Sequence, residues 1–164
     1  MKIYSKEGDN LKTKTLNNKV YKDDYLIEVS GTIDEVQAYL MVIYNHINDE
    51  EIKKILFSIC KDLFTLSYNI SINKAFPEEK TIELESIIDD YENMLTPLDK
   101  FIMPGQTKDS SLIHVARTVV RRCERVIVTY ARKNNVHKEI LKYINRLSDL
   151  LFIIARYIEE SPNN

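Results

Sequence analysis

Residues that form tight turns are scarce in this chain, which has three glycines and four prolines among 164 residues. All-β and α/β folds need many turns, and those turns use glycine and proline heavily. The stretches between these residues instead repeat apolar side chains with a helical period. The chain is therefore predicted to be all-α, and its length suits a single domain with one core.

Five segments carry an apolar stripe at helical spacing. We expect one helix to follow the capping residues Asp23 and Asp24 and to end near residue 47, and four more at about 49–72, 78–94, 110–133 and 137–160. Residues 1–22 lack this period and are predicted to form an irregular N-terminal arm. The chain 1–164 is thus expected to be one domain, a five-helix bundle over 23–160 with a long connection at 96–111.

Composition limits the classes of partner. The net charge of −2 gives no overall attraction to nucleic acid or to an anionic membrane, and neither is expected as a partner. The longest apolar run, residues 150–155, is far too short to span a bilayer. Cys60 and Cys123 fall at helical core positions without CxxC or Cys/His ligand spacing, which predicts reduced thiols in a cytoplasmic protein.

Residues 112–125, LIHVARTVVRRCER, place two different faces on one helix. Successive residues turn by about 100°, so an apolar face includes Leu112, Val115, Ala116, Val119 and Cys123. The opposite face gathers His114, Arg117, Thr118, Arg121, Glu124 and Arg125, with Arg122 on the flank. Arginine suits polyphosphate because its planar fork donates two parallel hydrogen bonds and keeps its charge. A solvated face held by Arg–Glu pairs, each worth about 0.3–0.5 kcal/mol, is the alternative that this pattern alone leaves open.

Two other helices carry polar residues at unusual positions. Asn145, Ser148, Asp149 and Phe152 share one face of the last helix, where the polar groups contact either a neighbouring helix or a ligand. In the first helix, Gly31 costs about 1 kcal/mol relative to alanine, which predicts close packing or the approach of a ligand. Asp34, one turn later, can pair with an arginine of the fourth helix.

The long connection contains the apolar run Phe101-Ile102-Met103 followed by Pro104-Gly105. This run either clamps the end of the bundle or forms a hydrophobic wedge at a site. No two histidines have ligand spacing with a cysteine or carboxylate, so a structural zinc or di-iron site is not expected. The sequence also lacks a P-loop, a nucleophile elbow and a Ser–His–Asp arrangement.

Taken in order, these segments resemble the motifs of the PduO-type ATP:cob(I)alamin adenosyltransferases. That family pattern has a TKTGDKGTT-like arm, then KDD, GTVDEL, FILPGG, HVARTVCRRAER and NRLSDLLF. The corresponding segments here are SKEGD (5–9), KDD (22–24), GTIDEV (31–36), FIMPGQ (101–106), HVARTVVRRCER (114–125) and NRLSDLLF (145–152). The last two are long and specific, and the resemblance spans nearly the whole chain.

The resemblance implies a homotrimer of five-helix bundles with an active site at each subunit interface. The implied reaction transfers the 5′-deoxyadenosyl group of ATP to cob(I)alamin and releases triphosphate. Because cobalt(I) is the nucleophile, no catalytic Ser, Cys or His is needed. A reductase that supplies cobalt(I) and an enzyme that uses adenosylcobalamin are the implied protein partners.

Site residues are carried over by position. In the arm, ATP would contact Ser5, Lys6, Gly8, Thr13 and Lys22. In the bundle, ATP and its Mg²⁺ would be held by Arg121, Arg122, Glu124, Arg125 and Asn145, with the metal near Glu124 and no protein residue assigned as its ligand. Catalytic roles fall to Arg121, to Arg117 paired with Asp34 across the interface, and to Phe101, which would border the corrin and help keep the lower axial ligand off cobalt.

The arm departs from the family pattern. Residues 7–13 read EGDNLKT in place of TGDKGTT, and Asn17-Asn18 replace a GG pair, with one residue deleted. Fewer glycines leave fewer positions where backbone amides approach phosphates closely. Glu7 adds negative charge, which Lys12 and Lys14 can offset. A non-catalytic cobalamin- or nucleotide-binding carrier or sensor is therefore the alternative function, while the net charge disfavours an RNA-contacting scaffold.

Overall fold

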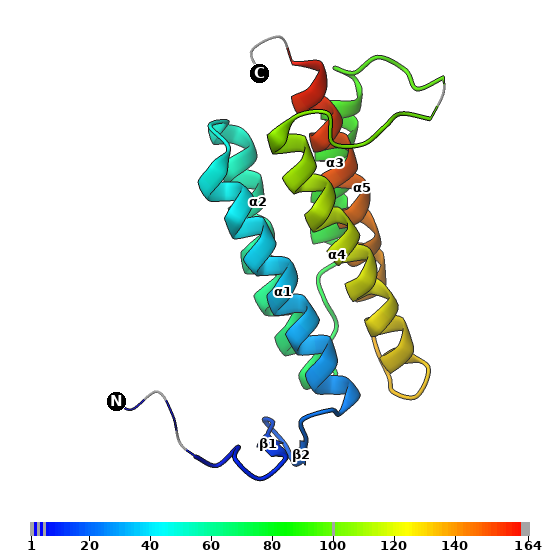
Figure 1. Cartoon of the computed structure of the whole chain (residues 1–164). Helices are drawn as coiled ribbons and strands as arrows, with labels where there is room; N and C mark the ends of the chain where they lie inside the picture. Colours follow the sequence, from blue (N-terminus) through cyan, green and yellow to red (C-terminus); the bar gives the residue numbers. More distant parts are fainter. Residues whose placement is uncertain (1, 3, 5, 100, 162–164) are drawn as a thin grey trace.

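The computed structural model describes residues 2, 4, 6–99 and 101–161. Five helices account for most of it, which confirms the all-α prediction: α1 (Tyr25–His46), α2 (Glu50–Ser71), α3 (Glu79–Glu92), α4 (Lys108–Ala131) and α5 (Lys138–Glu160). The strands β1 (Lys12–Lys14) and β2 (Lys19–Tyr21) precede them. Figure 1 shows the helices side by side in an elongated bundle, with the strands beyond the end at which α1 begins.

Polar side chains set the first turns of three helices. Asp24 accepts a hydrogen bond from the backbone N–H of Leu26 at 2.8 Å and caps α1, and Asp49 caps α2 in the same way. Thr107 and Ser110 form a reciprocal capping box, so α4 begins at Lys108. The helix thus begins two residues earlier than the apolar periodicity predicts, because the capping residues lie before the first apolar residue of the stripe.

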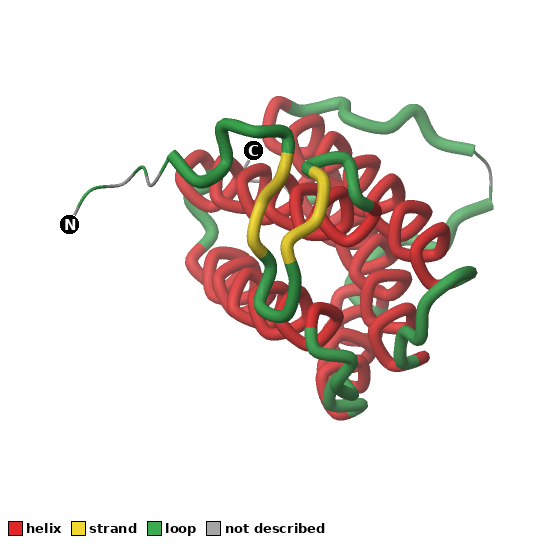
Figure 2. The backbone as a smooth tube through the Cα atoms, turned by 90° about the horizontal axis from the view of Figure 1, so that it is seen from below, coloured by secondary structure: helices red, strands yellow, loops and turns green. Residues whose placement is uncertain are grey.

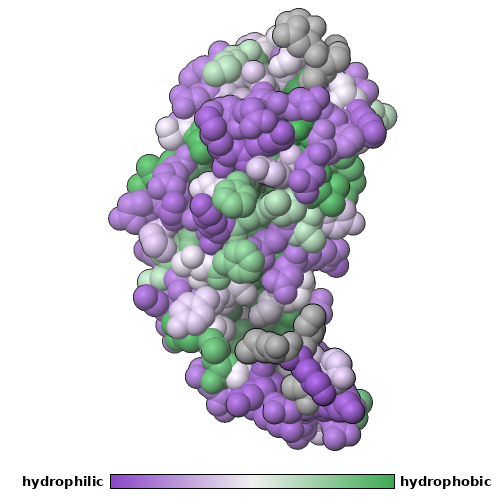
Figure 3. All heavy atoms as spheres, turned by 90° about the vertical axis from the view of Figure 1, so that its left-hand side faces the viewer, coloured by the Kyte–Doolittle hydropathy of each residue, from purple (hydrophilic) through white to green (hydrophobic). Residues whose placement is uncertain are grey.

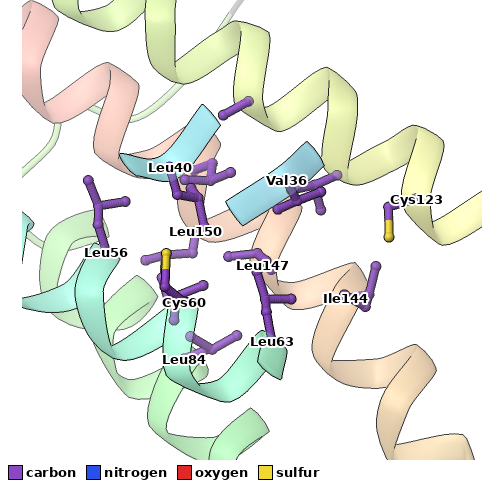
Figure 4. Close-up of a cluster of buried hydrophobic side chains, with 14 of the residues drawn as sticks. Val36, Leu40, Leu56, Cys60, Leu63, Leu84, Cys123, Ile144, Leu147 and Leu150 are labelled. Atoms are coloured by element: carbon purple, nitrogen blue, oxygen red, sulfur yellow. The ribbon is translucent and has the colours of Figure 1, made fainter. Parts of the chain in front are cut away.

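The core lies along the line where the helices meet. α1 packs against α2 and α4, α4 against α5, and α5 against α3. Aliphatic side chains from α1, α2, α3 and α5 interlock there, as Figure 4 shows for Val36, Leu56, Leu84 and Leu147. Cys60 and Cys123 are buried and free. Among the described residues no helix is long and apolar enough to cross a membrane.

The N-terminal arm contains a hairpin that the sequence did not predict. β1 and β2 are antiparallel, and Thr13 lies opposite Val20. The backbone N–H of Thr15 donates to the carbonyl of Asn18 at 2.7 Å and closes the turn. Strands of three residues are too short to show an alternating pattern in the sequence. Figure 2 shows this hairpin lying across one end of the bundle.

The arm and the connection that carries Phe101 lie at opposite ends of the bundle. The arm enters α1 at Tyr25, whereas the connection leads into α4 at Lys108, beside the end of α5 (Figure 1). The 22 residues of α1 span about 33 Å at 1.5 Å per residue. Within one chain, the two segments are therefore separated by about the length of a helix.

Candidate active site

α4 presents arginines that lack carboxylate partners. Arg122 pairs with Glu35 of α1. Within the described ranges, Arg117, Arg121 and Arg125 form no ion pair with a carboxylate. Arg121 and Arg125 are exposed, and Arg117 is half-buried. Like charges at this helical spacing destabilise each other, so the surface is suited to receive an anion or a carboxylate from another molecule.

Arg117 is oriented by two neighbours. Its Nε–H donates to Nδ1 of His114 at 3.2 Å, and its guanidinium carbon lies 5.9 Å from the ring centre of Phe152 on α5. The sequence placed His114 on the same face of the helix as Arg117, and the two side chains are in contact; His114 is nevertheless buried, with 7% of its surface exposed and its ring centre 6.2 Å from that of Phe152. Burial, and then the charge of Arg117, lower the pKa of His114.

A groove of about 290 Å³ lies between α3, α4, α5 and the connection that precedes α4. Arg117 and Arg121 line it from α4, and Ser148, Asp149 and Phe152 line it from α5. The polar face predicted on the last helix thus lies beside the arginine face. Five other lining residues were not predicted as site residues: Ile88, Glu92, Leu98, Ile153 and Arg156. Arg156 follows Phe152 by four residues, so its helical spacing was the available signal.

Glu124 and Asn145, both predicted site residues, contact each other. The Asn145 side-chain amide donates to Oε1 of Glu124 at 3.1 Å. Arg146, which sequence analysis missed, donates to the side-chain oxygen of Asn145 at 3.0 Å and to Glu85 of α3 at 2.7 Å. The chain of contacts from α3 to α4 fixes which way the Asn145 amide faces. The described residues contain no group of three or more His, Cys, Asp or Glu side chains that could hold a metal ion.

Asp34 lies apart from the arginines of its own chain. It is exposed and lines a hollow of about 560 Å³ between the arm and helices α1 and α2, with Lys14, Phe64 and Tyr68. Pairing of Asp34 with an α4 arginine inside one chain is therefore wrong, because Glu35, one helical step further, faces α4 instead. A Cβ added at Gly31 would meet no atom within 4 Å, so close packing inside the chain does not explain this glycine.

The arm brings most of its predicted residues into one small region. The Lys22 ammonium lies over Gly8, where an added Cβ would be 3.4 Å from Nζ, and Thr13 is half-buried in β1. Lys6 lines a hollow of about 490 Å³ together with Lys14 and Lys19. Ser5 lies outside the described residues.

The lysines of the β1–β2 hairpin differ in how available they are to an anion. Lys14 and Lys19 stand directly opposite each other, a cross-strand pair of like charges that destabilises the hairpin unless an anion lies nearby. Lys12 is less available than the sequence suggested, because its Nζ lies 4.6 Å from the ring centre of Tyr21.

Leu11 adopts a backbone conformation that favours glycine. Its φ is 61°, in the left-handed region, and its side chain is 76% exposed. In the family pattern described above, glycine occupies this position. Leucine therefore occupies a conformation that glycine adopts without strain.

Phe101 points into solvent. Its relative exposure is 106%, and that of Met103 is 77%, so these side chains do not clamp the bundle end in a single chain. The hydrophobic-wedge interpretation remains.

A family model described as cobalamin adenosyltransferase matches residues 3–158, from the arm to the last turns of α5. The chain belongs to the cobalamin adenosyltransferase family. The corrinoid adenosyltransferase of Bacillus subtilis is 34% identical over 96% of this chain and 86% of its own length. That of Citrobacter freundii is 34% identical over 99% of this chain and 97% of its own length.

Solved members of the cobalamin adenosyltransferase family share the fold. A variant of the PduO-type ATP:corrinoid adenosyltransferase from Lactobacillus reuteri, complexed with cobalamin and ATP, superposes with a TM-score of 0.90 at 33% identity. The match covers 96% of this chain and 90% of that one. Another variant of that enzyme, complexed with ATP, gives a TM-score of 0.89 at 34% identity, over 95% of this chain and 93% of that one.

Proposed function

We propose that this protein transfers the 5′-deoxyadenosyl group of ATP to cob(I)alamin, giving adenosylcobalamin and triphosphate. Family membership and the similarity to enzymes complexed with cobalamin and ATP support this function. The observation that carries it is the set of arginines Arg117, Arg121 and Arg125, which form no ion pair with a carboxylate of the described residues, on the helix that also supplies Glu124 of the Glu124–Asn145 contact. A triphosphate supplies the negative charge that these arginines lack in the isolated chain.

The step needs no protein nucleophile. Cobalt(I) donates an electron pair to C5′ of ATP, the Co–C bond forms, and the bond from C5′ to the triphosphate oxygen breaks with its electrons leaving on triphosphate. Arg121 and Arg125 would stabilise the charge that develops on that leaving group, and Arg122 would contribute if it releases Glu35. Asn145 and Glu124 would orient the nucleotide so that C5′ faces cobalt.

Mg²⁺ fits this site as an ion coordinated mainly by the phosphate oxygens of ATP. Mg²⁺ commonly keeps several waters and takes one or two carboxylates in addition to substrate phosphates. Glu124 is the carboxylate beside the arginines, and Asn145 occupies one of its oxygens at 3.1 Å. When bound, the ion would neutralise phosphate charge.

The arm of one copy and α4 of another would together form each site in a homotrimer. The arm and Phe101 lie at opposite ends of a helix about 33 Å long, whereas cobalt and C5′ must come within bonding distance. This separation supports a site to which two chains contribute, one through its arm and the other through Phe101. The unpaired Asp34 of one copy would meet Arg117 of the next.

The face of α2 supports such an assembly. Phe57, Phe64 and Tyr68 are exposed there at helical spacing, and Figure 3 shows hydrophobic patches among hydrophilic residues on this side of the molecule. Exposed aromatic side chains are common at interfaces between subunits.

In the shared site, the arm would hold the triphosphate and Phe101 would border the corrin. Lys6, Lys14 and Lys19 supply the charge of the arm, while Ser5, Gly8, Thr13 and Lys22 complete it. Phe101 would help keep the lower axial ligand off cobalt. A reductase would supply cobalt(I), and an adenosylcobalamin-dependent enzyme would take the product. The two free buried thiols support a reducing, cytoplasmic location.

The deciding experiment mixes the protein with chemically reduced cobalamin and MgATP and follows the absorption of cobalt(I). We expect that absorption to disappear as the Co–C bond forms, with one triphosphate released per corrinoid. Binding of both substrates without loss of the cobalt(I) signal would overturn the proposal and favour the carrier or sensor. Light scattering over micromolar concentrations tests the trimer, and a monomer throughout would remove the shared site.

A further inference from the structure

The last turn of α5 holds one end of the connection that carries Phe101. Oε1 of Glu159 accepts hydrogen bonds from the backbone N–H groups of Gly105 and Gln106, both at 2.9 Å. Neither contact belongs to a helix ladder, and each spans more than fifty residues of sequence. One carboxylate oxygen therefore fixes the position of two consecutive peptide groups.

The next residue of α5 holds the other end. Oε2 of Glu160 accepts from the backbone N–H of Thr96 at 3.0 Å, and Arg156 donates to the Thr96 carbonyl at 2.6 Å and to Oε1 of Glu160 at 2.7 Å. Arg156 is 4% exposed. The bond from the Thr96 N–H is the largest cause that lowers the pKa of Glu160, so this carboxylate stays ionised at neutral pH.

The position of Gly105, next to the Glu159 anchor, can be filled only by glycine, and its backbone is closely held. Its φ is +81°, and an added Cβ would lie 2.9 Å from Oγ of Ser111. That hydroxyl also donates to the Gly105 carbonyl at 2.9 Å. The backbone here is thus held from both sides, with its N–H directed at Glu159 and its carbonyl at Ser111.

The anchored connection forms one wall of the arginine groove. Leu98 lines the groove together with Arg117, Arg121 and Phe152, and Phe101 stands fully exposed between the two anchors in sequence. A flexible connection would need to be ordered whenever a flat apolar ligand bound against Phe101, and that ordering lowers affinity. Anchors at Thr96 and at Gly105 and Gln106 reduce this cost.

We propose that Glu159 is a positioning residue for corrinoid binding: by holding the Gly105 and Gln106 amides it fixes the chain four residues after Phe101, and so limits where Phe101 can lie, before the corrinoid arrives. The role of the corrinoid rests on the proposed function, whereas the anchoring does not. Glu159 makes no contact described above with Arg121 or with the Glu124–Asn145 pair, and its charge reaches the arginine face only through His114. Its main effect should therefore fall on the corrinoid and not on ATP.

The test compares Glu159→Ala with Glu159→Gln in the full-length protein. Removing the acceptor should raise the KM for cob(I)alamin by about tenfold or more, while the KM for ATP changes less than about twofold. Glutamine keeps an oxygen that accepts both N–H bonds and should restore the KM to within about threefold of the wild type. Glu139→Ala, at the other end of the same helix, is the matched control.

A second measurement separates the anchor from the activity. Chymotrypsin cleaves after exposed phenylalanine, and cleavage after Phe101 should be several-fold faster in Glu159→Ala than in the wild type or Glu159→Gln. Circular dichroism checks that the helices are intact. Equal KM values for cob(I)alamin and equal cleavage in all variants would overturn the proposal. Faster cleavage in a protein without adenosyl transfer would uphold the anchor while the proposed function failed.

Discussion

Arg117 donates its Nε–H to Nδ1 of His114, one turn earlier on α4, at 3.2 Å. The bond requires Nδ1 to act as an acceptor, so His114 is neutral and carries its proton on Nε2. Nε2 itself is buried and has no hydrogen-bond partner among the residues that the structure describes. The neutral imidazole of His114 thus orients the guanidinium of Arg117, a predicted site residue. Protonation of His114 at Nδ1 would place an N–H of the imidazole against the Nε–H of Arg117.

The pH dependence of stability should report this arrangement. Burial lowers the pKa of folded His114 below its ordinary value of 6.5, so the unfolded chain binds this proton more readily. The contribution to stability is complete above about pH 6.5 and is lost as the pH falls through the folded pKa. His114→Asn keeps an acceptor near Nδ1 but does not titrate. In urea unfolding, the wild type should lose more stability between about pH 7 and pH 5 than this variant, and equal slopes would contradict the assignment.

Arg121→Ala should remove adenosyl transfer without changing the fold. Arg121 is exposed and forms no carboxylate ion pair within the described chain, so its loss costs little packing. Each charge-assisted hydrogen bond to phosphate is worth about 1.5–3 kcal/mol, which slows transfer about tenfold to hundredfold per bond. Helical content by circular dichroism should be unchanged. Arg132→Ala, at the end of α4, is the control, and activity within a few-fold of wild type in Arg121→Ala would mean that this face is only solvated.

A charge exchange tests the proposed contact between copies. Asp34→Arg places a cation where a neighbour's Arg117 is expected, and Arg117→Asp places two carboxylates together. Each single variant should shift the trimer toward smaller species in light scattering, whereas the double variant should recover part of the trimer because the pair is restored in reverse. If the double variant assembles no better than the singles, Asp34 and Arg117 do not meet.

Leu11→Gly should strengthen ATP binding. The left-handed φ of 61° costs a leucine about 1–2 kcal/mol, whereas glycine adopts it freely. The side chain is 76% exposed, so little packing is lost. Glycine should raise the fraction of free chains whose arm holds this conformation, and the ATP dissociation constant should therefore fall several-fold in calorimetric titration. The control is Leu16→Gly, another exposed leucine of the arm, which lacks a positive φ; an equal gain there would show that strain at Leu11 is not the cause.

Lysines of the hairpin should make ATP binding sensitive to salt. Attraction by exposed charges is screened beyond about 8–10 Å at physiological ionic strength. Lys12→Ala combined with Lys14→Ala should raise the ATP dissociation constant at low salt and flatten its dependence on salt. Lys14→Ala alone should give most of this effect, because Lys12 already lies over Tyr21. Glu7→Thr should act in the opposite direction, and unchanged affinity in all of these variants would show that the arm does not hold ATP.

Local chemistry explains what could be predicted before the structure. Asp24 was one of two candidate caps of the first helix, and Asp49 stands at the beginning of the second predicted helix. Each accepts a hydrogen bond from a backbone N–H two residues later, so the cap depends on sequence neighbours alone. The α4 start was placed late because the Thr107–Ser110 box precedes the apolar stripe. The β1–β2 hairpin was missed because three-residue strands carry no readable period.

The sequence by itself determined the all-α fold, the family and the presence of an arginine face on one helix, because these depend on helical period and on motifs continuous in the chain. Only the tertiary structure decided that Glu35 rather than Asp34 faces α4, that His114 is buried against Phe152, and that Glu159 reaches Gly105. Each of these depends on which helices pack together and on their rotation. A step of about 100° per residue places a side chain on its own helix but does not tell which neighbour it meets.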